Sequence, residues 1–150
     1  MVRKGVIGLG NPLRGDDGIS VVLIRKLREE NFPSEVEFLN IGTGGIKALH
    51  GLRRLDKAII LDAVFFGEDP GEHVFFDPEE VRSLKRTKNP HDFTLFEVLN
   101  LSKRMEELPE EILIMDIQPK DISLKEGLSP ELEKKVPEML DALRRKIVEL

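Results

Sequence analysis

The chain has 150 residues, a net charge of −5 at pH 7 and no cysteine, and 40% of its residues are hydrophobic. This length predicts one domain over residues 1–150 with a sizeable core. The lack of cysteine excludes disulfides, thiolate nucleophiles and iron–sulfur clusters, so a metal site would need carboxylate or imidazole ligands. The acidic balance argues against nucleic-acid binding. No apolar run approaches the ~20 residues of a membrane span, so we expect a cytoplasmic protein without membrane insertion.

The first half of the chain alternates between strand and helix patterns. Short apolar runs bounded by turn residues are typical of strands buried on both faces, and apolar residues at helical spacing indicate the helices between them. In chain order we expect a strand at 5–9, a helix at 19–30, a strand at 36–41, a short helix at 45–52 and a strand at 57–61.

The second half continues this alternation. We expect a strand at 73–76, a helix start at Asp77-Pro78-Glu79-Glu80, a helix at about 93–105, a strand at 112–115 and a terminal helix opened by Ser129-Pro130. Pro137 should kink the terminal helix or split it. Together these patterns predict an α/β fold, doubly wound, with a mostly parallel twisted sheet of about five strands and helices on both faces.

Polar side chains follow the predicted strands where ligand sites of open α/β sheets form, at the carboxyl ends. Asp16 and Asp17 follow the first strand, Asp62 follows the third, and His91 precedes the helix at 93–105. If the first and third strands are neighbours, Asp17 and Asp62 converge, and a loop bearing His91 could close over them. Two carboxylates and an imidazole suit Ni²⁺ or Zn²⁺, which could polarise a carbonyl or activate water.

Each of these residues also has a structural interpretation. Asp16 and Asp17 are typical of helix caps and first turns, Asp62 could cap a loop, and His91 could be an exposed loop imidazole. Gly42-Thr43-Gly44-Gly45 after the second strand could hold an anion or a peptide backbone on its N–H groups, or could form a tight strand-to-helix turn.

A nucleotide-binding function is disfavoured by the first loop. Gly8, Gly10 and Gly15 do not fit the dinucleotide pattern, because the third glycine comes too late and an acid pair follows where a pyrophosphate would lie. The sequence also lacks the Walker A, Gly-x-Ser-x-Gly and His-Glu-x-x-His motifs.

Several segments in combination resemble the hydrogenase maturation endopeptidases. Members of that family remove a short C-terminal extension from the precursor of a [NiFe]-hydrogenase large subunit once nickel has been inserted. The similar segments cover essentially the whole chain: Gly8-Leu9-Gly10-Asn11-Pro12-Leu13-Arg14-Gly15-Asp16-Asp17-Gly18, Gly42-Thr43-Gly44-Gly45, Leu61-Asp62-Ala63, Pro90-His91-Asp92, Ile117-Gln118-Pro119 and Leu128-Ser129-Pro130.

The resemblance implies a single maturation-protease-like domain over residues 1–150 whose partner is the large-subunit precursor. It places Asp17, Asp62 and His91 at the family's metal-binding positions, where they would act in catalysis by coordinating nickel held by the substrate. Zn²⁺ or Cd²⁺ could occupy the same site. Some members carry Glu in place of Asp17. Our candidate substrate-binding residues are Asp16, Gly42, Thr43 and Gly44, and Asp16 would support the loop or assist proton transfer.

Two other functions are compatible with parts of this pattern. A chaperone that checks the metal of the large subunit without cutting it would use the same three side chains. Gly8-Leu9-Gly10-Asn11-Pro12 also resembles the opening of bacterial peptidyl-tRNA hydrolase. That family continues with an Arg-His-Asn segment, which is absent here, and an acidic chain suits a tRNA substrate poorly.

Overall fold

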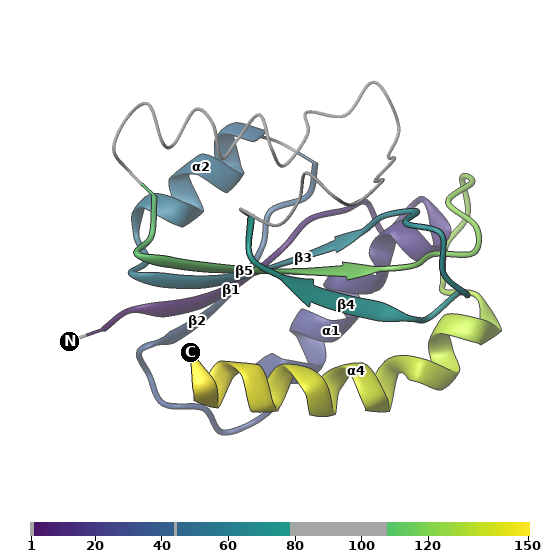
Figure 1. Ribbon diagram of the computed structural model, residues 1–150. Helices are drawn as coiled ribbons and strands as arrows, with labels where there is room; N and C mark the ends of the chain where they lie inside the picture. Colours follow the sequence, from purple (N-terminus) through teal and green to yellow (C-terminus); the bar gives the residue numbers. More distant parts are fainter. Residues whose placement is uncertain (1, 44, 79–107) are drawn as a thin grey trace.

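The computed structural model describes residues 2–43, 45–78 and 108–150 (Figure 1). The expected helix at 93–105 and residues 79–80 of the expected helix start lie outside these ranges. The elements in chain order are β1 (Lys4–Gly8), η1 (Gly15–Gly18), α1 (Ile19–Arg28), β2 (Val36–Asn40), α2 (Gly45–Arg53), β3 (Lys57–Ala63), β4 (His73–Phe76), β5 (Glu111–Ile117) and α4 (Pro130–Glu149).

The sheet has five strands in the order β2-β1-β3-β5-β4. Strands β2, β1, β3 and β5 run parallel, and the edge strand β4 pairs antiparallel with β5. The three central strands are mostly buried, as expected for a sheet covered on both faces. The predicted doubly wound, mostly parallel sheet is therefore confirmed, and β1 and β3 are neighbours.

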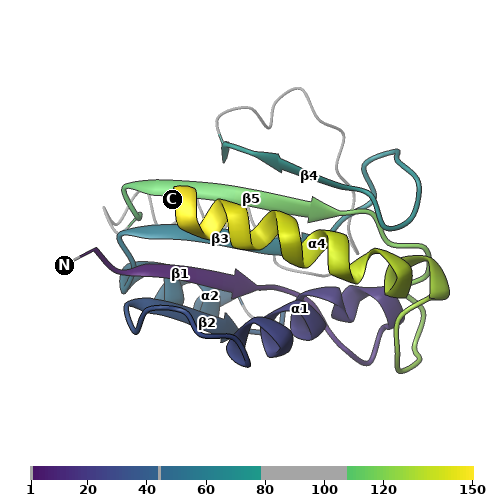
Figure 2. The same ribbon diagram turned by 90° about the horizontal axis from the view of Figure 1, so that it is seen from below.

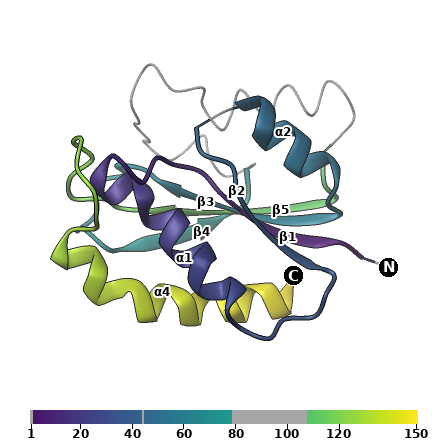
Figure 3. The same ribbon diagram turned by 180° about the vertical axis from the view of Figure 1, so that it is seen from behind.

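Helices cover both faces of the sheet. Helix α2 lies on one face, whereas α1 and α4 lie on the other (Figures 1 and 3). Seen from below, α1 and α4 lie side by side across the strands (Figure 2). Each face has its own apolar core: one contains the buried residues of α1 and α4, and the other packs Ala48 and Leu52 of α2 against Ile7, Ile60 and Ile114. The carboxyl ends of the strands form the edge of the sheet that lies between these two cores.

Two local predictions need correction. Helix α4 runs without a break through Pro137, so of the kink or split that we expected the split does not occur. The proline leaves the carbonyl of Glu133 without its helical hydrogen bond, and both residues are exposed, so water can satisfy that carbonyl. Strand β3 extends to Ala63, two residues beyond the expected end, so Asp62 lies within the strand. In the part of the chain described, no helix is long and apolar enough to cross a membrane.

Candidate functional site

Asp17 lies in the turn that follows β1. Its Oδ2 accepts a hydrogen bond from the backbone N–H of Asn11 at 2.8 Å, which fixes the orientation of the buried carboxylate. The turn is tight because Gly10 has φ +131°, and a Cβ at this position would lie 2.0 Å from the carbonyl oxygen of Asp17. Only glycine therefore fits position 10, and the glycine-rich loop serves to bring η1 close to the end of the strand.

Asp62 reaches the same edge of the sheet from β3. Gly8 of β1 pairs with Leu61 of β3, and the N–H of Leu9 donates to the carbonyl of Leu61 at 2.9 Å. Asp62 is the next residue of β3 and is buried, and η1 lies against the same strand. The adjacency of β1 and β3 thus brings Asp17 and Asp62 to one edge, as the sequence predicted.

The third predicted ligand, His91, lies outside the described residues. Within residues 2–43, 45–78 and 108–150, no three His, Asp or Glu side chains are grouped closely enough to hold a metal ion. Asp17 and Asp62 both have interactions within the fold. The three-residue metal site therefore stays a prediction. Two of its residues, Asp17 and Asp62, lie at the carboxyl edge of the sheet.

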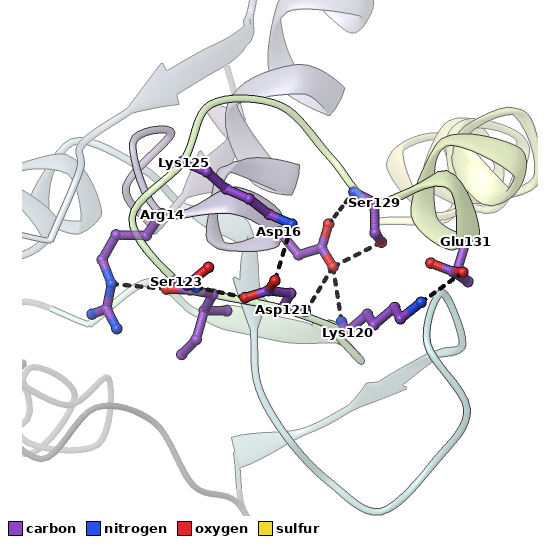
Figure 4. Close-up of polar contacts among 9 residues, drawn as sticks. Arg14, Asp16, Lys120, Asp121, Ser123, Lys125, Ser129 and Glu131 are labelled. Carbon is purple, nitrogen blue, oxygen red and sulfur yellow. Dashed lines mark hydrogen bonds and ion pairs between the residues drawn. The ribbon is translucent and has the colours of Figure 1, made fainter.

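The Asp16 carboxylate points toward the segment between β5 and α4 (Figure 4). It is fully buried and accepts four hydrogen bonds from that segment. The backbone N–H groups of Lys120 and Asp121 donate to Oδ2 at 2.8 and 3.1 Å. The N–H of Ser129 donates to Oδ1 at 2.7 Å, and the Ser129 hydroxyl donates to Oδ2 at 2.9 Å. We call this arrangement the Asp16 clamp; it supports the loop, whereas its predicted contact with substrate is untested.

The clamp also explains the start of α4. Ser129 occupies the N-cap position and Pro130 follows, as predicted, but the serine hydroxyl makes no capping bond. It donates to Asp16 instead, so the residue that looks like a helix cap in the sequence connects α4 to η1. A further contact links the clamp to α4, because the Lys120 side chain forms an ion pair with Glu131 at 2.9 Å.

The loop between the clamp residues is itself ordered by charge. The Asp121 carboxylate accepts from the N–H of Ser123 at 2.8 Å and pairs with Lys125 at 2.9 Å. These contacts hold the pKa of Asp121 well below its usual range, and the same pairing raises the pKa of Lys125. Arg14 reaches across to the carbonyl of Ile122 at 3.1 Å. The segment is thus fastened to the loop that precedes η1.

The glycine-rich turn after β2 contributes backbone rather than side chains. Gly42 has φ +65°, and its carbonyl accepts from the N–H of Gly10 at 3.0 Å, which ties this turn to the β1 loop. Thr43 is exposed, and Gly44 lies outside the described residues. The turn therefore borders the candidate site, and its binding of substrate stays a prediction.

Sequence reasoning missed one acidic residue at this edge. Asp116 of β5 is buried and pairs in register with Asp62 of β3, so both side chains project from the same face of the sheet. The available signal was the likeness of Met115-Asp116-Ile117 to Leu61-Asp62-Ala63, since each places one acid near the end of an apolar strand. Asp116 has interactions within the fold.

Comparisons with known proteins agree with this architecture. A family model described as hydrogenase maturation protease matches residues 21–146. The chain is 30% identical over 149 residues to coenzyme F420 hydrogenase subunit delta of Methanothermobacter thermautotrophicus, covering 92% of this chain and 90% of that protein. It is 30% identical over 136 residues to hydrogenase expression/formation protein HoxM of Azotobacter vinelandii, covering 85% of this chain but 66% of that protein.

Among solved structures, the hydrogenase maturating endopeptidase HybD from E. coli has the same fold. The TM-score is 0.87 at 29% sequence identity, and the alignment covers 98% of this chain and 93% of that chain. The similarity therefore extends over nearly the full length of both chains.

Proposed function

The chain belongs to the hydrogenase maturation protease family, and from that premise we propose that it is the endopeptidase that removes the C-terminal extension of a [NiFe]-hydrogenase large-subunit precursor after nickel insertion. The peptidase class predicted from the sequence is confirmed at the level of the family. In the proposal the nickel belongs to the substrate, and Asp17, Asp62 and His91 bind it. Zn²⁺ or Cd²⁺ could take the same position.

The pairing of β1 with β3 is the observation that carries the proposal. It brings Asp17, on η1, and Asp62, near the end of β3, to one edge of the sheet. Carboxylate oxygens are suitable ligands for a divalent ion, and an added imidazole favours a transition metal. The peptide N–H of Asn11 orients Asp17 in the way that outer hydrogen bonds orient ligands at metal sites.

The proposed chemistry is hydrolysis of one peptide bond. Nickel that already has ligands from the precursor would complete its coordination with the oxygens of Asp17 and Asp62 and the imidazole of His91. The bound ion could then polarise the scissile carbonyl or lower the pKa of a water molecule. A precursor without nickel offers nothing for the two carboxylates to bind, which would make cleavage depend on completed metal insertion.

The direct test mixes the purified protein with nickel-loaded and nickel-free precursor and follows the mass of each large subunit. We expect only the loaded form to shorten. Asp17→Asn, Asp62→Asn and His91→Ala should each lower the cleavage rate by about 100-fold or more, because the first two replace an anionic ligand by a neutral amide and the third removes the imidazole ligand. Asp141→Asn is the matched control, because it alters an exposed carboxylate of α4, and its rate should equal that of the wild type.

The other outcomes identify the alternatives. Equal shortening of both precursors would contradict recognition of nickel. Tight binding of the loaded form without any change in mass would contradict the peptidase proposal and favour the metal-checking chaperone. The family match favours a protease over a peptidyl-tRNA hydrolase.

A further inference from the structure

Two exposed leucines lie on neighbouring loops beside η1. Leu13 is 56% exposed and Leu124 is 84% exposed. Their loops are joined, because the N–H of Lys125 donates to the carbonyl of Leu13 at 3.0 Å. We call residues 11–14 together with 121–128 the lip. The lip therefore presents two large apolar side chains to solvent at the carboxyl edge of the sheet.

A groove of about 380 Å³ separates the lip from α1. Its apolar wall is formed by Pro12 and Leu128 from the lip side and by Val21 and Val22 of α1. Charged side chains line it as well: Arg25, Glu126 and Glu133. The anchoring side chains of protein partners pack into pockets, and an apolar depression with a few charged groups in its lining is suited to receive one.

The lip is held in place by hydrogen bonds, so its exposed leucines are not a consequence of a loose loop. The N–H of Gly15 donates to the carbonyl of Lys125 at 2.8 Å, and Arg14 and Lys125 form an isolated bridge. The Asp16 clamp fastens both ends of the segment, at Lys120 and at Ser129 (Figure 4). Because the backbone of these loops is already held in place, binding a partner costs less conformational entropy than ordering a loose loop would, which favours an interaction surface.

The position of the groove indicates its occupant. Gly15 and Gly18 line the groove, and Asp17 lies between them in the same turn, which spans roughly 6 Å. A standard protein interface buries about 800 Å² on each partner, which corresponds to a disc of about 16 Å radius. A folded protein that presents a metal ion to Asp17 through an interface centred on this turn covers the groove as well.

We propose that the lip and its groove bind an apolar side chain on the surface of the large-subunit precursor, beside the bond that is cut. This inference rests on the proposed function. The lip contributes affinity without contacting the metal, so precursor with and without nickel should both use it. Cleavage of the bound precursor would then depend on nickel, while the affinity for the precursor depends on the lip.

The test compares the double variant Leu13→Ser/Leu124→Ser with Val148→Ser. Val148 is 78% exposed on α4 and is the matched control for replacing an exposed apolar residue. With nickel-loaded precursor, we expect the double variant to raise KM about tenfold and to leave kcat within about twofold, as for loss of an anchoring contact. Its Kd for nickel-free precursor, measured by calorimetry, should rise by the same factor. The control should change neither value.

Each result separates the lip from the nickel site. If the wild type binds precursor and the double variant binds it equally well, the inference is wrong while the proposed function stands. If the wild type neither binds nor cuts precursor, the proposed function fails. If the wild type forms a dimer that the double variant abolishes, without any change in precursor affinity, the occupant is a second copy and the inference is overturned. All three substituted side chains are exposed, so Tm should stay within about 2 °C of the wild type.

Discussion

Asp16 and Asp17 are successive residues with the same side chain, and both are buried in η1. The Asp16 carboxylate faces the segment between β5 and α4 and accepts four hydrogen bonds from it. The Asp17 carboxylate accepts a hydrogen bond from Asn11 and lies at the same carboxyl edge of the sheet as Asp62. Consecutive side chains of a 3₁₀ turn point in directions about 120° apart, so neighbours face different surroundings. Burial by itself therefore does not distinguish a carboxylate that supports the fold from a candidate metal ligand. The hydrogen-bond partners of each carboxylate make that distinction.

The largest expected effect on stability comes from Asp16→Ala. The substitution leaves three backbone N–H groups and the Ser129 hydroxyl without their acceptor, and the two donors of Ser129 are buried. We expect a loss of about 3 kcal/mol in the free energy of unfolding, measured with urea. Asp17→Asn keeps an oxygen that can accept from Asn11, so its loss should stay below about 1 kcal/mol while cleavage falls. Comparable losses for the two variants would break the distinction between them.

A smaller effect is expected at the serine of the clamp. Ser129→Ala removes the hydroxyl bond to Asp16 but keeps the shorter bond from its N–H, so the free energy of unfolding should fall by about 1 kcal/mol. Ser20 provides the matched control, because its Oγ is equally buried and finds no hydrogen-bond partner among the described residues. Ser20→Ala should be neutral or stabilising. A Ser129→Ala loss no greater than that of Ser20→Ala would show that the hydroxyl bond adds nothing.

The smallest effect concerns pH and lies away from the clamp. His73 contacts the Phe75 ring, and burial lowers the pKa of its imidazole, against the opposing charges of Glu138 and Glu72. The unfolded chain therefore takes up this proton more readily, and stability should fall as pH decreases below about 6.5. In His73→Gln the decrease in Tm between pH 7 and pH 5 should be smaller than in the wild type. Identical decreases in the two proteins would contradict this contribution.

The candidate site was predictable to the extent that it follows from strand order. Apolar runs identified β1 and β3, and placing them side by side was sufficient to bring Asp17 and Asp62 to one edge. Asp116 was missed because the sequence pattern does not show the register of β5 against β3, which pairs it with Asp62. Ser129 was recognised as a helix start, but its bond to Asp16 spans 113 positions and has no local signature.

The sequence by itself determined the elements, the parallel character of the sheet and the family, because apolar periodicity, turn residues and short motifs are local properties of the chain. Only the tertiary structure decided the direction in which each carboxylate of the Asp16–Asp17 pair points. The direction of the Asp16 carboxylate depends on hydrogen-bond partners more than 100 residues away, which become neighbours only when the loop between β5 and α4 packs against η1.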